Sequence, residues 1–336
     1  MKKRASITDI AREANVNPST VSLALRDSPR VAPETKQKIK DLAVKFKYKP
    51  NYLARALKGH NTRSIGICMF TLETPFFINM LSAVERYFHD RHYVSMVSVV
   101  RNNSHEEENE IMERMLHRSV DGLCLSYAHS IGHFANQLHG IPMSTYVEKS
   151  AYSSRGIVKA NYVICDVTKG IDMLVAHLKK LGHKRLAYLG WSSRNKEVGE
   201  IFNANNIHYT PNDFNIVSSL DDDDLIKRTL TAIMTSKNRP TAIITFSDEY
   251  AISVIDNLIK LGYRVPEDIS VTGINNYSYS DKVKVPITTI DIPIKAIATS
   301  MARMLYTQIE NDSEDTQIEY FEPSLVIRQS TGKCCN

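Results

Sequence analysis

The chain has 336 residues, 43% of them hydrophobic and 24% charged, so it can build two or three compact globular units. No apolar run approaches the ~20 residues of a membrane span, and no apolar segment follows the basic start MKKRASITD, so we expect a cytoplasmic protein without a signal peptide. Residues 1–60 hold fourteen Lys and Arg against five Asp and Glu, a charge of +9, whereas residues 61–336 carry −4. A basic headpiece on a mildly acidic body is typical of a nucleic-acid reader with a separate regulatory part.

The first sixty residues predict a helix-turn-helix. Apolar residues at helical spacing between Ile7 and Ala14 predict a first helix, and Asn15-Val16-Asn17 forms a tight turn. Asn17 suits a helix N-cap and Pro18 the first helical position, so a second helix begins there and ends near residues 27–29. A pair of short helices joined in this way can place the second helix in the major groove of DNA.

A third helix is expected from Pro33 to Phe46, with apolar residues along one face and lysines over the rest. Some of these lysines form an ordinary solvated face, and others are expected to touch phosphates and give salt-sensitive affinity. The lysines in and beside this helix are Lys36, Lys38, Lys40, Lys45 and Lys47.

Three stretches carry a specific resemblance: ITDIAREANVNPSTVSLAL, SPRVAPETKQKI and YKPNYLARALKG. Together they resemble the DNA-binding end of the LacI/GalR (lactose-repressor) family of bacterial transcription regulators. The resemblance implies that residues 1–49 form the DNA-binding domain and that residues 50–60 form a hinge helix and linker. It further implies that the hinge folds when two subunits meet on operator DNA and that Leu57 enters the minor groove, which is a known way to kink a duplex. The alternative is that Leu57 is a core residue of a linker helix. The residues implied in DNA contact are Thr8, Asn17, Pro18, Ser19, Thr20, Ser22, Leu23, Asn51, Arg55 and Leu57.

The recognition helix departs from the commoner family pattern. Pro18 and Ser19 occupy two base-reading positions, and Leu23 stands where many members carry an arginine. Pro18 has no donor, and Leu23 offers only apolar contact, for example to a thymine methyl group. We therefore expect weak guanine readout at the base that faces Leu23.

From Arg63 onwards, apolar strand patterns alternate with helical ones, which predicts parallel sheets covered by helices. The expected fold is therefore an all-α headpiece followed by an α/β core of two doubly wound parallel-sheet subdomains. The resemblance implies that this core, residues 61–336, binds an effector, dimerises and shares its fold with periplasmic binding proteins. LGHKRLAYLG, VPEDISVTGI, PITTIDIP and EPSLVIRQST also look like family signatures. The expected N-subdomain spans about 61–160 and 291–322, and the C-subdomain about 161–290 and 323–331, with crossing segments near residues 161 and 290.

Ligands of doubly wound sheets bind beyond the carboxyl ends of the strands, here in the cleft between the subdomains. The residues implied in effector binding are Phe76, Phe77, Tyr127, Arg194, Ser247, Glu249 and Asn275. The sequence departs from the family in a short segment before Arg194, in the loss of the R-x-x-G-F pattern after it, and in Asn275 where an aspartate is expected. An asparagine both donates and accepts hydrogen bonds, which is compatible with a sugar or a nucleoside. The alternatives are a different effector or none.

No metal or cofactor is expected. Asp221 to Asp224 precede a helical pattern and read as helix-capping residues rather than as a calcium site, and His129, His133 and His139 lack carboxylates at fixed spacing. Cys68, Cys124 and Cys165 lie in apolar runs without CxxC spacing and are expected to be buried free thiols.

The sequence thus predicts a sequence-specific DNA-binding regulator, a repressor, that binds a near-palindromic operator as a homodimer, with a tetramer as the alternative. The helix of residues 75–91 is expected to contribute to the dimer. A small-molecule effector, a carbohydrate or a nucleoside, would couple the cleft to the hinges. Two other classes stay open: a small-molecule receptor without a DNA role, and a Rossmann-like enzyme. The basic headpiece argues against the first. HExxH, Walker, GxGxxG and GxSxG motifs are all absent, which argues against the second.

Overall fold

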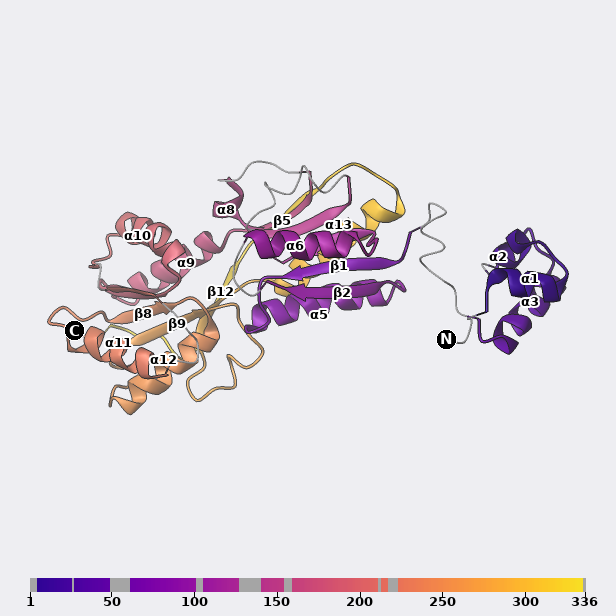
Figure 1. Ribbon diagram of the computed structural model, residues 1–336. Helices are drawn as coiled ribbons and strands as arrows, with labels where there is room; N and C mark the ends of the chain where they lie inside the picture. The colour runs from indigo at the N-terminus through magenta and orange to yellow at the C-terminus, as the bar shows by residue number, and fades with distance from the viewer. Residues whose placement is uncertain are drawn as a thin grey trace. The chain divides into compact units, whose positions relative to one another are not determined.

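A computed structural model describes residues 5–25, 27–48, 61–100, 105–126, 140–153, 159–210, 213–216 and 223–334 (Figure 1). The chain divides into two compact units, one up to Thr62 and one from Arg63 onwards. Each unit has its own hydrophobic core, so each is described by itself.

The described part of the first unit, the headpiece, contains three helices: α1 (Ile7–Ala14), α2 (Pro18–Leu25) and α3 (Pro33–Lys45). Each helix contributes a fully buried residue to the shared core, namely Ile10, Val21 and Ile39. The helices are too short to be stable alone, so this packing stabilises them. The predicted helix-turn-helix is therefore present.

The ends of α1 explain the tight turn. Ser6 and Asp9 form a capping box at its start: Asp9 Oδ2 accepts the Ser6 backbone N–H at 2.9 Å, and Ser6 Oγ accepts the Asp9 N–H at 3.3 Å. Asn15 ends the helix in the left-handed region (φ 56°), which asparagine tolerates better than most residues. The Val16 N–H then bonds back to the Ala11 carbonyl at 3.0 Å and turns the chain into α2.

The second unit, the core, contains two six-stranded sheets with the orders β11-β5-β4-β3-β1-β2 and β12-β10-β9-β8-β6-β7. Every described pairing is parallel except that of β10 with β12. The strands of the first sheet are β1 (Ser64–Met69), β2 (Val94–Val99), β3 (Gly122–Leu125), β4 (Met143–Glu148), β5 (Asn161–Cys165) and β11 (Ile318–Phe321). Those of the second are β6 (Leu186–Gly190), β7 (Phe214–Ile216), β8 (Ala242–Thr245), β9 (Ser270–Ile274), β10 (Thr288–Asp291) and β12 (Ser324–Val326).

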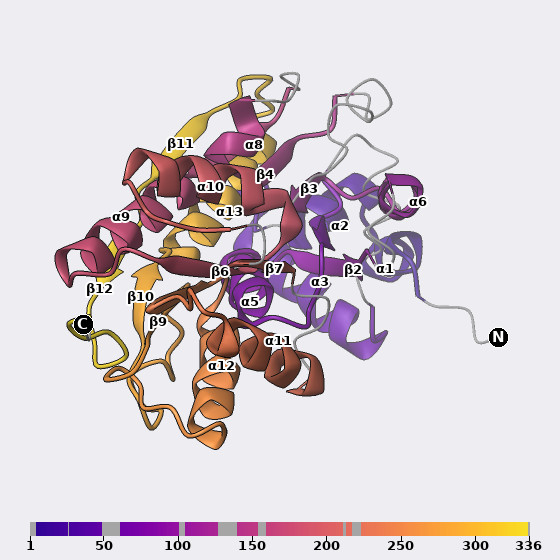
Figure 2. The same cartoon turned by 90° about the vertical axis from the view of Figure 1, so that its left-hand side faces the viewer.

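Helices cover both faces of each sheet. The helices are α5 (Pro75–His89), α6 (His105–Leu116), α8 (Lys149–Ser153), α9 (Val167–Lys180), the short 3-10 turn η1 (Ser192–Arg194), α10 (Asn195–Ala204), α11 (Asp223–Thr235), α12 (Asp248–Lys260) and α13 (Ile294–Glu310). In the first sheet, α13 lies beside α5 and against β3, β4 and β5, while α6 packs on the other face. In the second, α9 and α10 lie on one side and α11 and α12 on the other (Figure 2).

Successive strand residues supply opposite faces of the sheet. In β6, Leu186 and Tyr188 join the cluster beneath α9 and α10, whereas Ala187 and Leu189 join the cluster beneath α11 and α12. All four are buried, as expected for a parallel strand covered on both faces.

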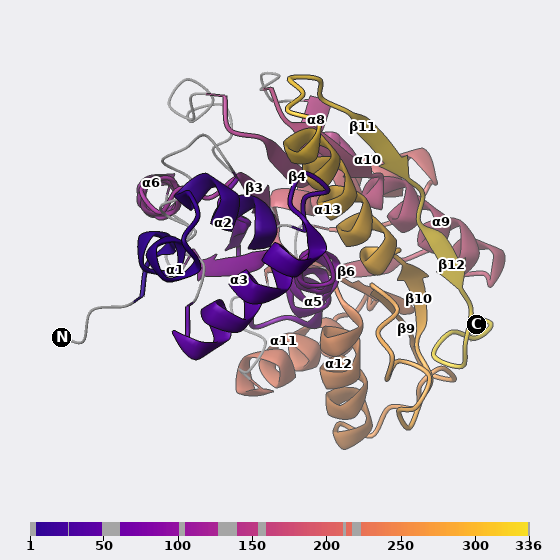
Figure 3. The ribbon, with the colours of Figure 1, turned by 90° about the vertical axis from the view of Figure 1, so that its right-hand side faces the viewer.

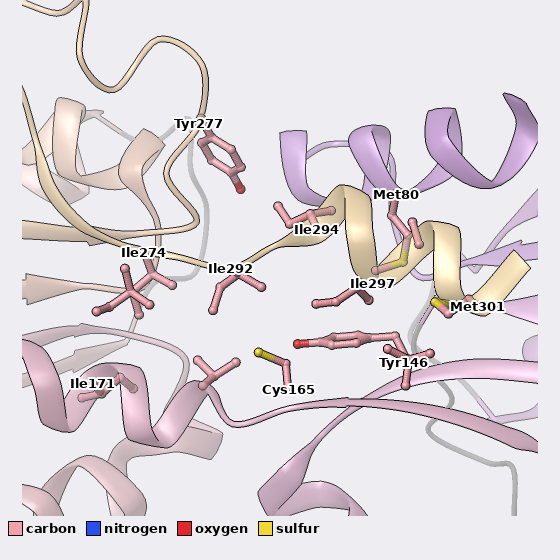
Figure 4. Packing of buried hydrophobic residues seen from close by; sticks show 14 of the residues in the cluster. Met80, Tyr146, Cys165, Ile171, Ile274, Tyr277, Ile292, Ile294, Ile297 and Met301 are labelled. Atoms are coloured by element: carbon pink, nitrogen blue, oxygen red, sulfur yellow. The ribbon is translucent and has the colours of Figure 1, made fainter. Parts of the chain in front are cut away.

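Three segments carry the chain between the sheets: β5 to α9, β10 to α13, and β11 to β12, the last seen as a continuous yellow run in Figure 3. The first crossing follows Cys165, so the predicted crossing near residue 161 is corrected. The reason is that all of β5 is buried and pairs with β4 and β11 of the first sheet. Buried apolar side chains continue through the crossings, where Ile292 and Cys165 lie between residues of the two subdomains (Figure 4).

Candidate functional site

The headpiece offers the exposed start of α2 as a nucleic-acid interface. Asn17, Pro18 and Ser19 are exposed, and Thr8 in α1 is exposed as well. Thr20 and Ser22 are half-buried. Because the apolar face of α2 packs inwards through Val21 and Ala24, the predicted base-reading face points away from the headpiece core.

Leu23 is less available than its sequence position suggests. Its side chain is half-buried and packs against the headpiece core. An apolar contact to a base from this position would therefore be limited.

Several of the predicted phosphate-contacting lysines have partners within the headpiece. Lys40 pairs with Asp27 at 2.7 Å, and Lys36 donates to the Asp27 carbonyl at 3.0 Å. Lys45 lies 3.4 Å from Glu13, with both side chains more than half exposed. Exposed pairs of this kind contribute little to stability and can exchange partners. These contacts tie α3 to the turn after α2 and to α1.

In the core, the predicted effector residues that the structure describes follow the carboxyl ends of parallel strands. Phe76 and Phe77 lie in the first turn of α5 after β1, and Arg194 ends the turn after β6. Ser247 and Glu249 follow β8, and Asn275 follows β9. This is the edge at which doubly wound sheets bind ligands. Several residues named from the sequence lie outside the described residues, namely Asn51, Arg55, Leu57, Tyr127, His129, His133, His139, Asp221 and Asp222.

On the side of the first sheet, the predicted site is aromatic. The rings of Phe76 and Phe77 meet edge to face with centroids 5.1 Å apart, and Phe76 also contacts Tyr146 at 5.7 Å. Phe77 further contacts Phe70 at 5.7 Å. Both phenylalanines are half-buried, so they pack on their own subdomain and still present ring surface.

The two subdomains meet through an ion pair. The Arg194 guanidinium donates through Nη2 to Glu148 Oε1, and the exposed fractions of the two side chains are 18% and 19%. Burial lowers the pKa of Arg194, but Glu148 together with Tyr188, Tyr146 and Glu197 more than offsets this, so the pKa is raised and the group stays charged. Sequence reasoning missed Glu148, although its place at the carboxyl end of the apolar strand MSTYVE was an available signal.

On the side of the second sheet, two of the predicted effector residues also make hydrogen bonds within the protein. Ser247 caps α12, where its Oγ accepts the Tyr250 N–H at 3.2 Å. Asn275 has a φ of 101° and donates through Nδ2 to Tyr277 Oη at 2.9 Å. Its amide is therefore partly used within its own loop.

Asp248, which sequence reasoning also missed, is a buried acceptor that links several elements at this edge of the sheet. It is fully buried and accepts hydrogen bonds from Tyr277 N (2.9 Å), Ser280 Oγ (2.6 Å) and Thr289 Oγ1 (2.5 Å). Burial raises its pKa above the ordinary value even though these donors favour the carboxylate. Asp248 thus connects the start of α12 to the loop after β9 and to β10.

Trp191 adds a further aromatic surface that sequence reasoning did not assign. It follows β6, is nearly half exposed, and contacts Phe246 edge to face at 5.2 Å. Phe246 in turn contacts Tyr250 at 5.3 Å.

An open surface depression of about 930 Å³ lies at the opposite edge of the second sheet, beside residues that precede β6 and β8. It is lined by Arg185, Asn203, Ile207, His208, Tyr209, Lys237, Asn238 and Arg239. None of the predicted effector residues lines it.

The described residues contain no group of three or more His, Cys, Asp or Glu side chains that could hold a metal ion. Asp223 and Asp224 stand in the first turn of α11, and Asp223 accepts from Asn257 Nδ2 at 2.5 Å. Cys68, Cys124 and Cys165 are buried free thiols, as predicted, and burial raises the pKa of each to about 12. Across the part of the chain that is described, no helix is long and apolar enough to cross a bilayer.

Comparison with known proteins accounts for both units. Residues 6–51 match the family model of bacterial regulatory proteins of the lacI family, and residues 175–331 match that of periplasmic binding protein-like domains. The HTH-type transcriptional repressor PurR of Histophilus somni is 26% identical over 340 residues, which cover 97% of this chain and 98% of that relative. PurR of Klebsiella pneumoniae strain 342 is 27% identical over 339 residues, covering 98% and 97% of the two chains.

Solved structures agree. The lac repressor dimer bound to operator and the anti-inducer ONPF has a TM-score of 0.83 at 22% identity, covering 98% of this chain and all of that chain. The complex of the transcriptional regulator CelR with cellobiose has a TM-score of 0.68 at 20% identity, covering 97% and 100%. The predicted fold, a helix-turn-helix headpiece followed by a two-subdomain core with parallel sheets, is confirmed.

Proposed function

The chain belongs to the LacI family of bacterial transcriptional regulators, and we propose that it binds a near-palindromic operator as a homodimer under the control of a small molecule in the core. It is a DNA-binding transcriptional repressor and not an enzyme. Because its target is DNA in a bacterial cell, the cytoplasm is its place of action.

The observation that carries this proposal is the exposed start of α2 on a headpiece with its own core. The side chains of Asn17, Pro18 and Ser19 are exposed, and residues 1–60 carry a net charge of +9. Such a helix can enter the major groove while the basic surroundings contact phosphates. We assign Thr8, the exposed residues of α2, Thr20 and Ser22 to the DNA contact, with a smaller contribution from the half-buried Leu23.

The linker residues complete the proposed contact. By resemblance to the family, Asn51 and Arg55 approach the DNA and Leu57 enters the minor groove. These three lie outside the described residues, so their roles rest on the resemblance alone.

The effector would bind at the carboxyl edge of the two sheets. Rings there can stack on a flat or cyclic ligand, and the polar residues Arg194, Glu249 and Asn275 can hydrogen-bond to it. A relative of the same fold is described as a complex with cellobiose, and another, from Enterococcus faecium, with ribose. We therefore propose a carbohydrate or a nucleoside, whose binding changes the separation of the hinges and so the affinity for DNA.

The homodimer is proposed to form through α5 and the neighbouring edge strand β2. Ile78 in α5 is 48% exposed, and Val94 and Val97 in β2 are 63% and 42% exposed. Large apolar side chains gathered on adjacent elements are typical of a surface that another protein covers.

A receptor without a DNA role is disfavoured, because the family match at residues 6–51 covers the DNA-binding headpiece itself. The test is selection of bound fragments from a bacterial genome followed by gel shifts at increasing salt. We expect a defined duplex whose binding constant falls steeply with salt, by roughly 0.9 in log–log slope for each phosphate contact. Ser19→Glu, which places a negative charge on the exposed start of α2, should weaken binding. The matched control Glu314→Gln, a change in the core, should not. Recovery of no duplex would overturn the proposal.

A further inference from the structure

The Glu148–Arg194 pair joins the two subdomains at the edge where a ligand would bind. Glu148 is the last residue of β4 in the first sheet, and Arg194 ends η1, directly after β6 of the second sheet. Four-fifths of each side chain is buried, so the pair is poorly screened by water and by salt.

An arginine at such an edge would ordinarily be the group that takes an anionic ligand. Its planar guanidinium matches carboxylates and phosphates with two parallel hydrogen bonds. Here Glu148, a carboxylate of the chain itself, already accepts from Nη2. The buried Nη1 has no hydrogen-bond partner among the described residues, so Arg194 keeps a donor but no uncompensated charge.

The neighbouring lysines are also paired with carboxylates, in pairs that are more exposed than that of Arg194. Lys149, next to Glu148, pairs with Asp166 at 2.9 Å, and Lys169 in α9 pairs with Glu322 at 2.5 Å. Lys196 is exposed on α10, where water screens it. The Glu249 side chain adds negative charge on the side of the second sheet.

What remains is suited to neutral polar groups. Arg194 Nη1 can donate, and the buried Asn195 Oδ1, which has no partner in the described part of the chain, can accept. Both atoms are buried, so a ligand with hydroxyl or amide groups would satisfy them only if the groups that cover them move aside; left unpaired, they cost free energy. Phe76 and Trp191 provide aromatic surface at the ends of their strands.

We infer that Glu148 is a built-in counter-ion that occupies the anion position at Arg194, so that the cleft takes an uncharged ligand and rejects its phosphorylated or carboxylated counterpart. The ligand is then a free sugar or a nucleoside, and a sugar phosphate or a nucleotide is excluded. This inference rests on the proposed function, because it names the ligand class of the same cleft.

The test measures anion binding by the full-length protein, with inorganic phosphate and ribose 5-phosphate as probes and ribose as the neutral comparison. Thermal stability and calorimetric binding are recorded at constant ionic strength. The wild type should show no saturable phosphate binding that depends on Arg194. Glu148→Gln keeps the size of the side chain and an amide oxygen that can accept from Arg194, but removes the charge. We expect this variant to bind phosphate saturably, with a dissociation constant at least about tenfold below the highest phosphate concentration at which the wild type shows no binding.

Two control variants isolate the effect. Glu314→Gln removes the same charge from the exposed Lys159–Glu314 pair and should gain no phosphate affinity. In the double variant Glu148→Gln/Arg194→Gln, the gain should disappear. The inference is overturned if Glu148→Gln binds phosphate no better than Glu314→Gln does.

A second measurement does not depend on the folding of a Glu148 variant. If the wild type is stabilised more by ribose 5-phosphate than by ribose, and Arg194→Gln abolishes that difference, the inference is overturned. Gel shifts on the same samples separate this result from the proposed function. Loss of all DNA binding would contradict the repressor proposal without affecting the inference about Glu148. If Glu148→Gln gains no phosphate binding while DNA binding is intact, only the inference about Glu148 is contradicted.

Discussion

At the scale of single residues, the position of Leu23 in α2 bears on which bases the protein can read. Its side chain carries no donor and is half-buried against the headpiece core. A guanine offers two acceptors in the major groove, and arginine is the side chain that matches both. The wild type therefore lacks the commonest guanine-reading contact at this position.

Leu23→Arg should introduce a guanine preference at the facing base. A bidentate contact is worth about 1–3 kcal/mol of discrimination, so sequences with that G·C pair should be enriched by roughly 5- to 150-fold. Selection from a pool of random operators checks this for both proteins. An invariant G·C pair at that position with the wild type, lost in Leu23→Ala, would contradict the assignment.

His183 should make stability depend on pH. Its imidazole is buried, with Nδ1 2.9 Å from Thr241 Oγ1 and Nε2 3.1 Å from both the Gly332 carbonyl and Ser270 Oγ. Burial lowers its pKa below the ordinary value of 6.5, although the Gly332 carbonyl favours the proton. The unfolded chain therefore takes up this proton at higher pH than the folded chain does. The contribution is present above pH 6.5 and is lost as the pH falls below it.

The free energy of unfolding of the wild type should thus decrease below about pH 6.5, with a slope of up to about 1.4 kcal/mol per pH unit from this proton. His183→Gln should make that slope shallower, as measured by urea unfolding at a series of pH values. His89→Gln is the matched control, because the His89 side chain is 76% exposed. An unaltered slope in His183→Gln would show that the histidine does not titrate between the two states as expected.

At the scale of elements, the close approach of β9 to the start of α12 shapes the second subdomain. A Cβ atom on Gly273 would lie 2.2 Å from Asp248 Oδ1 and 2.9 Å from Asp248 Cα. Only glycine fits between the strand and the helix, and this spacing lets Asp248 reach Tyr277, Ser280 and Thr289.

Gly273→Ala should lower the free energy of unfolding by about 1–3 kcal/mol or more, because the Asp248 backbone and its three hydrogen bonds would have to shift. Thermal unfolding measures the loss, and Ser278→Ala, at an exposed side chain in the following loop, is the control. Equal stability of the two variants would mean that α12 can move away without penalty.

At the scale of the whole molecule, the two units have separate cores and separate tasks. The headpiece buries Ile10, Val21 and Ile39 among its own helices, and the core buries its strands between its own helix layers. Each of these hydrophobic clusters lies within a single unit, so removal of one unit should leave the other unit folded.

A chain that begins at Arg63 should unfold cooperatively, near the temperature of the core transition in the intact protein, and should bind no operator. Circular dichroism melting and gel shifts at low salt check the two halves of this prediction. Retained operator binding by the shortened chain would contradict the division of labour, and an unfolded chain would contradict the independence of the core.

The sequence alone was sufficient for the headpiece, because α1 and α2 are local structures with local signals: helical spacing, an asparagine suited to the N-cap and a proline at the first helical position. The alternation of strands and helices was equally readable, as was the burial of the three cysteines. The signal for α13 was narrower, because ten of its 17 residues are buried and its exposed polar residues form one thin stripe, namely Lys295, Thr299, Arg303 and Glu310. The crossing predicted near residue 161 was misplaced, since only the pairing of β5 with β4 and β11 assigns that strand to the first sheet.

The chemistry of the cleft depended on tertiary structure. Glu148 and Arg194 lie 46 positions apart in the chain, and Asp248 and Thr289 lie 41 positions apart. No periodicity or motif relates such pairs, because they meet only when parallel strands align their carboxyl ends at one edge. The sequence determined what kind of molecule this is, through signals that neighbouring residues carry. The folded core decided which charges at its ligand edge are already compensated, because compensation depends on distances in space and on burial.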